Sequence, residues 1–220
     1  MFHDILSGDS ATPKTTKAIP VTLSTRIRLA RNLSEFPFPG RAEASQKRAV
    51  LTKCMEALTD IKELNDSLAV EVDDLSELER QILVEKHLIS RELSEIDEAS
   101  GIVLTQDRNC CIMINEEDHL RIQVLQPGLD FGKVWKRVDA LDSGIESEVS
   151  YAYDGELGFL TACPTNLGTG MRASAMMHLP GLVMSKNMDK VINAVSQLGI
   201  AVRGLFGEGS DASGSIFQIS

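Results

Sequence analysis

Four separated segments of this sequence hold residue types that could do chemistry: residues 24–28, 115–121, 163–172 and 203–208. In the first segment, Arg26 and Arg28 stand two positions apart, so an extended strand would present both on one face with Ile27 opposite. The other segments contain further arginines, several carboxylates and one cysteine. A guanidinium group binds phosphate oxygens through parallel hydrogen bonds, and a carboxylate can accept a proton or bind a cation. Together these residue types fit phosphate chemistry, although each one alone is more often a surface ion pair or an inert thiol.

The familiar signatures of nucleotide and metal sites are missing from the sequence. It has no Walker A loop, and residues 207–212 depart from the GxGxxG pattern at its last position. The four cysteines, Cys54, Cys110, Cys111 and Cys163, show neither a CxxC pair nor the Cys/His spacing of a zinc site. We therefore expect reduced thiols and no metal ion held by protein side chains.

Composition and charge exclude several classes of partner. The chain has 220 residues, of which 43% are hydrophobic and 25% charged, typical of a soluble globular protein. The formal net charge is −10, and residues 51–100 alone contain 14 acidic and five basic side chains. Nucleic acid and anionic membrane surfaces repel such a protein, so we expect neither as a partner. With no apolar run near the roughly 18 residues of a membrane span and no signal-peptide pattern, the sequence favours a cytoplasmic location.

The pattern of apolar residues predicts the elements that must position the four segments. Helices are expected over residues 41–64, 75–83, 130–147, 171–182 and 188–198. Strands are expected over residues 19–32, 68–72, 119–125, 201–203 and 215–219, with hairpins at 102–114 and 151–161 around polar turns. Hairpins next to helices favour an α+β fold over a parallel βαβ sheet.

Taken together, the four segments resemble the ATP:guanido phosphotransferases, a family that includes creatine and arginine kinases and the bacterial protein-arginine kinases. The resemblance rests on Ser24–Asn32, Asn115–Arg121, Cys163–Thr169 and Arg203–Glu208, which follow the family order and span residues 21–220. Val84–Ser90 and Arg172–Pro180 look most like the bacterial protein-arginine kinase branch. The resemblance implies an α+β fold with an antiparallel β-sheet flanked by helices, the glutamine synthetase-like catalytic domain of guanidino kinases.

The resemblance also implies roles for individual residues. Glu117 would take the proton from the acceptor guanidinium, Glu208 would hold that guanidinium as a second carboxylate, and Cys163 would orient the acceptor nitrogen. The phosphates of ATP would lie among Arg26, Arg28, Arg121, Arg172 and Arg203, and His87 would contact the nucleotide. The nucleotide site would further include Ser24, Thr25, Ile27, Met171, Ala173, Ser174, Ala175, Gly204, Leu205, Phe206 and Gly207. Mg²⁺ would be held mainly by the nucleotide. Five arginines in one place would repel one another without a polyanion between them, which is a physical reason to expect a triphosphate there.

The activity implied by the resemblance is that of a protein-arginine kinase. Such an enzyme transfers the γ-phosphate of ATP to arginine side chains to form phosphoarginine, which marks proteins for degradation or regulates a stress response. Two alternatives stay open: a kinase for free arginine or another small guanidino compound, and a nucleotide-binding regulatory module without turnover. The expected partners are proteins with exposed arginines, an activator or adaptor protein, protease machinery, and a second copy of the chain in a homodimer.

The domain organisation expected from the sequence is simple. Residues 1–20, with their Ser, Thr, Gly and Pro, are expected to form a flexible lead-in, and residues 21–220 to form one catalytic domain. Related kinases continue beyond the position of Ser220 with further strands and helices. By resemblance, this chain is therefore expected to lack their C-terminal portion.

Overall fold

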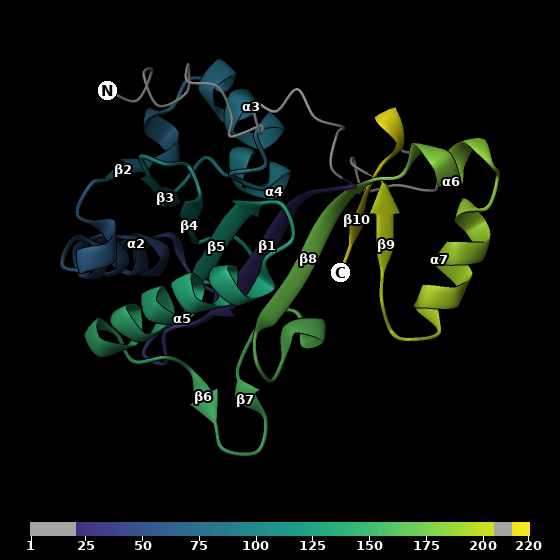
Figure 1. Cartoon of the computed structure of the whole chain (residues 1–220). Helices are drawn as coiled ribbons and strands as arrows, with labels where there is room; N and C mark the ends of the chain where they lie inside the picture. The colour runs from purple at the N-terminus through teal and green to yellow at the C-terminus, as the bar shows by residue number, and fades with distance from the viewer. Residues whose placement is uncertain (1–20, 205–212) are drawn as a thin grey trace. The chain divides into compact units, whose positions relative to one another are not determined.

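The computed structural model describes residues 21–204 and 213–220 (Figure 1). These residues group into two compact units. The first unit contains residues 28–124 and 135–171, and the second unit contains residues 21–27, 125–134, 172–204 and 213–220. Three strands contribute residues to both units: β1 (Thr22–Arg31), β5 (Leu120–Pro127) and β8 (Met171–His178).

In the first unit, the sheet runs in the order β2-β3-β4-β5-β1. It includes β2 (Ser67–Glu71), β3 (Gly101–Thr105) and β4 (Cys110–Ile114). Successive strands from β2 to β5 are antiparallel, and Ile112 lies opposite both Val103 and Ile122. Strands β3 and β4 are buried along their whole length, because helices cover both faces of this part of the sheet. The hairpin expected at residues 102–114 is therefore confirmed.

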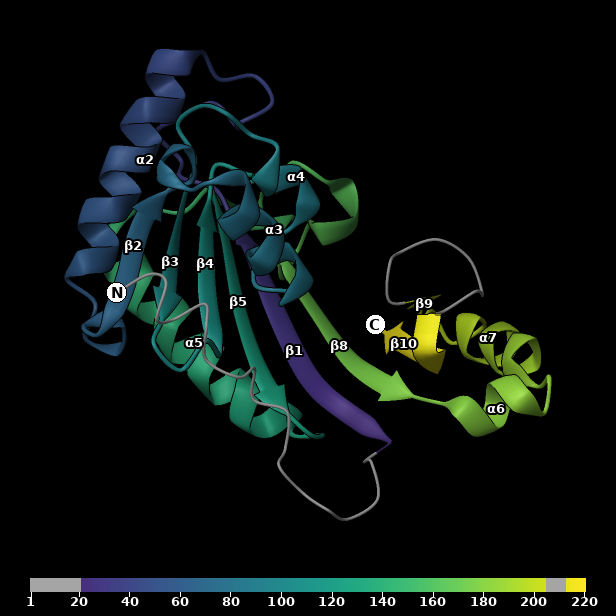
Figure 2. The same cartoon turned by 90° about the horizontal axis from the view of Figure 1, so that it is seen from above.

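Helices pack on the two faces of the first unit's sheet (Figure 2). On one face, α3 (Glu77–Glu85) and α4 (Arg91–Ser94) form a core with β3 and β4 that includes Leu83, Leu93 and Leu104. Helix α5 (Phe131–Glu148) lies on the opposite face (Figure 2). Helix α2 (Ala44–Thr59) packs closely on Gly101, where an added Cβ would lie 2.5 Å from Met55 Cε. The expected helices at residues 41–64, 75–83 and 130–147 are confirmed with shorter or shifted ends.

Short elements complete the first unit. A hairpin of β6 (Tyr153–Asp154) and β7 (Gly158–Phe159) confirms the one expected at residues 151–161. Three 3₁₀ turns are η1 (Lys62–Leu64), η2 (Val72–Asp74) and η3 (Pro164–Asn166). Among the described residues, none of the helices combines the length and the apolar composition that crossing a bilayer requires.

In the second unit, the sheet runs in the order β1-β8-β10-β9, with β9 (Val202–Gly204) and β10 (Ile216–Ile219). Strand β10 is antiparallel to both neighbours: Phe217 lies opposite Met177 of β8 and Gly204 of β9. The buried Phe217 side chain is only 1% exposed, so it forms the centre of this small core. The unit also contains α6 (Pro180–Met184), α7 (Met188–Ser196) and the 3₁₀ turn η4 (Ser213–Ser215).

The helix expected over residues 171–182 is wrong. Residues 171–178 form strand β8, and only Pro180–Met184 are helical. The intrinsic propensities of Met, Arg and Ala favour a helix, but the backbone pairing of residues 175–178 with β10 overrides that preference. Pro180 then begins α6, a position where its missing N–H breaks no helical hydrogen bond. The loop that begins at Cys163 therefore leads into a strand rather than a helix.

Candidate active site

Strand β1 carries the first predicted arginines on one face. Thr25, Ile27 and Leu29 are buried, while Arg26 and Arg28 between them are half-buried, as expected for alternation along a strand. The Thr25 hydroxyl donates to Gly128 O (2.6 Å) and accepts from Asp130 N (3.0 Å). Thr25 thus anchors β1 through these hydrogen bonds, and Ile27 packs in the core. Their contacts with a nucleotide stay a prediction.

Three predicted arginines of the second unit meet at strand β10. Arg26 Nη2 donates to Gln218 Oε1 (2.5 Å), and Arg172 Nη2 donates to Ser220 Oγ (2.9 Å). Arg203 of β9 lies directly opposite Gln218 in the register of the sheet. Gln218 and Ser220 are neutral acceptors, so these two contacts orient the guanidinium groups without neutralising their charge. Sequence reasoning missed both residues; the one available signal was a glutamine inside the apolar strand Ile216–Ile219.

In the first unit, the turn between β4 and β5 brings Arg121 and two carboxylates together. Arg121 Nη1 donates to Glu116 Oε1 (2.8 Å), and Arg121 Nη2 donates to Glu117 Oε2 (3.3 Å). The side chain of Glu117 is 44% exposed, whereas that of Glu116 is 3% exposed. Asn115 opens this turn with φ of 57°, a left-handed conformation that asparagine tolerates well. The predicted base is therefore accessible and already contacts a guanidinium.

A buried network joins this turn to the end of β1. Asn32 Nδ2 donates to Asp118 Oδ1 (2.6 Å), and His119 N donates to Asn32 Oδ1 (2.9 Å). Leu33 N donates to His119 Nδ1 (3.0 Å), so Nδ1 must be unprotonated and Nε2 donates to the carbonyl oxygen of Pro37 (3.0 Å). Burial lowers the pKa of His119, which favours this neutral ring. The network fixes the backbone that directly follows Glu117.

The loop that carries Cys163 is held by the same network. Ala162 N donates to Asp118 Oδ1 (2.7 Å), immediately before Cys163. The Cys163 Sγ lies 2.9 Å from Thr165 Oγ1, and Pro164 begins the turn η3. Cys163 is half-buried, whereas Cys54, Cys110 and Cys111 are buried. Because Asp118 contacts the loop and directly follows Glu117 in the chain, the structure ties the predicted base and the predicted assisting thiol to one buried carboxylate.

Arg31, which was not among the predicted phosphate ligands, holds the far end of this loop. Its guanidinium forms a two-point ion pair with Asp142 of α5 (3.1 and 2.7 Å) and donates to Thr169 O (3.0 Å). Arg31 Cζ also lies 3.6 Å from the centre of the Phe159 ring. The side chain is only 4% exposed, so these contacts assign it a structural role.

The segment between α3 and α4 carries His87. His87 is half-buried and has φ of 57°, which is strained for a residue other than glycine. Gln123 of β5, which is buried, donates from Nε2 to His87 O (2.8 Å) and so helps to hold this backbone conformation. Arg121 and Gln123 alternate with Ile122 along β5, so both project from one face of that strand.

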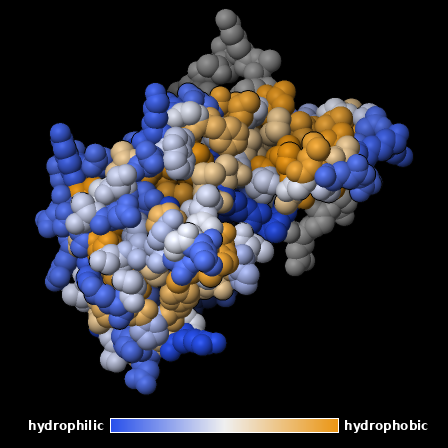
Figure 3. Space-filling model, turned by 90° about the horizontal axis from the view of Figure 1, so that it is seen from below, coloured by the Kyte–Doolittle hydropathy of each residue, from blue (hydrophilic) through white to orange (hydrophobic). Residues whose placement is uncertain are grey.

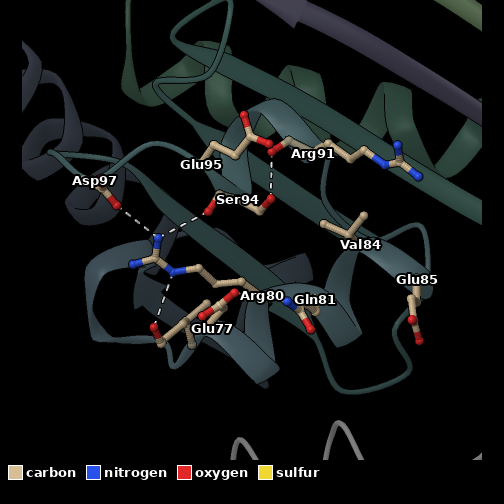
Figure 4. A pocket seen from close by; sticks show the side chains of 10 residues that line it. Glu77, Arg80, Gln81, Val84, Glu85, Arg91, Ser94, Glu95 and Asp97 are labelled. Carbon is tan, nitrogen blue, oxygen red and sulfur yellow. Dashed lines mark hydrogen bonds and ion pairs between the residues drawn. The ribbon is translucent and has the colours of Figure 1, made fainter.

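A cavity of about 760 Å³ lies between α3 and α4 (Figure 4). Arg80 crosses it and donates to Ser94 O (3.2 Å) and Asp97 Oδ1 (3.4 Å). Its lining residues include four acidic side chains but none of the predicted site residues. Among the described residues, no cluster of three or more His, Cys, Asp or Glu side chains could hold a metal ion.

The remaining predicted residues have varied positions. Ser24 is half-buried on β1, Met171 is exposed at the start of β8, Ala173 is half-buried, and Ser174, Ala175 and Gly204 are buried. Leu205, Phe206, Gly207 and Glu208 lie outside the described residues.

The fold and these residues define the class of protein. The family model described as ATP:guanido phosphotransferase, C-terminal catalytic domain, matches residues 49–220, so the chain belongs to this family. The chain is similar to the duplicated taurocyamine kinase from Schistosoma mansoni (TM-score 0.81, 25% identity, 96% of this chain and 31% of that one). It is also similar to lombricine kinase (TM-score 0.78, 25% identity, 90% of this chain and 58% of that one). The expected antiparallel sheet flanked by helices is thereby confirmed.

Within this family, the chain is similar to curated protein-arginine kinases. It is 47% identical over 208 residues to the enzyme of Desulforamulus reducens and 44% identical over 200 residues to that of Halothermothrix orenii. Each comparison covers 91% of this chain and 57% of the relative. The expected resemblance to the protein-arginine kinase branch is confirmed, and the chain spans little more than half the length of these relatives.

Proposed function

We propose that this protein is a protein-arginine kinase, which converts MgATP and an arginine side chain of a protein into ADP and phosphoarginine. The observation that carries the proposal is the accessible Glu117 carboxylate, which already holds the guanidinium of Arg121 at 3.3 Å. A carboxylate that binds one guanidinium can bind that of an acceptor arginine by the same hydrogen bonds. The similarity to protein-arginine kinases supports a protein-borne acceptor.

The proposed chemistry uses side chains in place of a phosphate-binding loop. A terminal nitrogen of the acceptor guanidinium, whose pKa is above about 12, gives a proton to Glu117 and attacks the γ-phosphorus. A nitrogen–phosphorus bond forms while the bond from the γ-phosphorus to the bridging oxygen breaks, and ADP leaves. Glu208 would hold the acceptor as a second carboxylate, and Cys163 would orient its nitrogen.

By family resemblance, Arg26, Arg28, Arg121, Arg172 and Arg203 would bind the phosphates of the nucleotide substrate. Their planar guanidinium groups suit the developing charge on the transferred phosphoryl group. Mg²⁺ would arrive with ATP and be held mainly by its phosphates.

We further propose the cellular setting from family resemblance. Residues 21–220 would form the catalytic part and residues 1–20 a lead-in. The enzyme would act in the cytoplasm, as a homodimer, with an activator or adaptor protein and with protease machinery. Its product would mark proteins for degradation or regulate a stress response.

A transfer assay tests the proposal. The protein is incubated with γ-labelled ATP and an arginine-rich protein, the same protein with its arginines changed to lysine, or free arginine. We expect label on the arginine-rich protein only, in a bond that acid hydrolyses, as a phosphorus–nitrogen bond requires. Label on free arginine alone would support the small-guanidino kinase, and nucleotide binding without any transfer would support the regulatory module.

A further inference from the structure

Glu116, which the proposed chemistry does not use, is buried behind Arg121. Its side chain is 3% exposed, and its Oε2 atom is buried without a hydrogen-bond partner among the described residues. Burial raises the pKa of this carboxyl group, while Arg121 and Ser90 favour its charged form. A buried carboxylate is unfavourable unless hydrogen bonds compensate for the lost water, so Glu116 depends on its contacts with Arg121 and Ser90.

Both contacts of Glu116 use the same oxygen. Oε1 accepts from Arg121 Nη1 at 2.8 Å and from the Ser90 hydroxyl at 2.7 Å. The Ser90 oxygen also accepts from Leu93 N (3.1 Å), which makes Ser90 the N-cap of α4. Glu116 thus connects the start of α4 to strand β5, and Ser90 can rotate away from it only by breaking the cap.

Glu116 consequently holds one terminal nitrogen of the Arg121 guanidinium. Nη1 is directed toward the buried Glu116, and Nη2 reaches the exposed Glu117 at 3.3 Å. An arginine side chain has many rotamers, and a fixed partner on one nitrogen removes most of that freedom before a ligand arrives.

We propose that Glu116 and Ser90 are positioning residues for Arg121, which hold Nη1 so that Nη2 is available to a phosphate oxygen of the nucleotide. The inference deepens the proposed function and rests on it in one respect, the binding of ATP by Arg121. Neither residue touches the nucleotide in this arrangement; both act through the guanidinium group.

The test measures nucleotide affinity and transfer in the 220-residue protein. Glu116→Gln keeps the shape of the side chain and removes its charge, and Ser90→Ala removes one hydrogen bond to Glu116. Ser76→Ala is the matched control, because Ser76 caps α3 through the N–H of Glu79 in the same way and belongs to an exposed capping box. We expect Glu116→Gln to weaken MgADP binding on the order of tenfold and Ser90→Ala severalfold, with KM for ATP rising more than kcat falls. Ser76→Ala should lower the melting temperature as Ser90→Ala does and leave nucleotide affinity unchanged.

A double-variant cycle separates positioning from a general structural role. In an Arg121→Ala background, Glu116→Gln should change MgADP affinity very little, because the group through which it acts is gone. The positioning role would be overturned if the effects of Glu116→Gln and Arg121→Ala on MgADP affinity multiplied in the double variant. It would also be overturned if Glu116→Gln and Ser90→Ala both kept wild-type MgADP affinity. In either case, transfer by the wild-type protein would still uphold the kinase activity. If Glu116→Gln and Ser90→Ala both lose MgADP affinity, but the wild-type protein binds MgADP and transfers no phosphate, the positioning role is upheld and the kinase activity is overturned. A wild type that binds no nucleotide would overturn both.

Discussion

Arg121 and Glu117 contact one another, although the family resemblance gives them different ligands. In the proposed reaction, Glu117 would exchange its 3.3 Å contact with Arg121 for a contact with the acceptor guanidinium. Phosphate oxygens can replace Glu117 as the partner of Arg121 Nη2, while Glu116 keeps Nη1. The two exchanges are compatible because each group gains a partner of opposite charge.

The proposed role of Glu117 as the base gives a direct prediction. Glu117→Gln removes a proton acceptor but keeps the size of the side chain, so transfer should fall by about 10²- to 10⁴-fold. Affinity for MgADP should stay near that of the wild type, as measured by direct titration. Glu92→Gln, an exposed change on α4, should retain both activities. An equal loss of transfer and of nucleotide affinity in Glu117→Gln would contradict a role as base.

His119 predicts how stability depends on pH. Its pKa in the folded state lies below the ordinary 6.5 because the ring is buried, so the unfolded chain takes up the proton first. The free energy of unfolding should therefore decline as pH falls below about 6.5 and toward the folded-state pKa. Urea unfolding at several pH values measures this slope. His119→Gln should reduce the slope in that range; an unchanged slope would exclude His119 as its source.

At the scale of single residues, the sequence predicts candidate reactive groups but not the groups that hold them. Glu117, Arg121 and Cys163 stand in short specific strings, so their positions could be predicted. The partners Asn32 and Asp118 are 86 residues apart and meet only in the folded chain. Gln218 and Ser220 were likewise missed, because a hydrogen bond between distant segments leaves no local pattern.

At the scale of elements, periodicity predicted α2, α3, α5 and the β3–β4 hairpin of the first unit, because each of these elements has buried apolar residues. It failed for β8, where Met171–His178 have residues that suit a helix but pair with β10. In a helix, the side chains of Arg172 and Ala173 would point in other directions than they do in strand β8, where successive side chains point to opposite faces of the sheet. Pairing between residues 175–178 and 216–219 is nonlocal, so a short sequence window contains no sign of it.

The contact between β7 and the Cys163 loop gives a prediction at this scale. Gly158 has φ of 79°, and an added Cβ would lie 2.4 Å from Gly168 O. Gly158→Ala should therefore displace the loop and destabilise the fold by about 1–3 kcal/mol or more. Chemical unfolding and the transfer assay measure both effects. In Gly155→Ala, where nothing lies within 4 Å of the new Cβ, both should stay near wild type. Equal behaviour of the two variants would show that the loop tolerates the shift.

At the scale of the whole molecule, the acidic charge lies on the surface and the arginines of interest lie on strands. Asp73, Asp74, Glu77, Glu85 and Glu95 are all exposed. The net charge of −10 describes this surface, whereas the guanidinium groups of the proposed site are local exceptions. A negative average charge therefore argues against extended polyanions as partners but not against a nucleotide.

The acidic surface should affect how fast a basic protein substrate is found. Long-range attraction accelerates encounter and is screened over about 10 Å at 0.1 M salt. We expect kcat/KM for an arginine-rich protein to fall severalfold between about 0.05 M and 0.5 M NaCl. A short peptide with one arginine and no net charge should show a much smaller decrease in the same assay. Parallel salt dependence of the two substrates would argue against steering by the surface.

The unequal burial of the cysteines offers a way to count folded molecules. Burial raises the pKa of both Cys54 and Cys110 to about 12 and also raises that of Cys111, whereas Cys163 is half-buried. A thiol reagent that absorbs light on reaction should therefore register one fast equivalent per native chain and four after denaturation. The ratio of the two readings would report the native fraction of any variant preparation before its kinetics are compared with wild type.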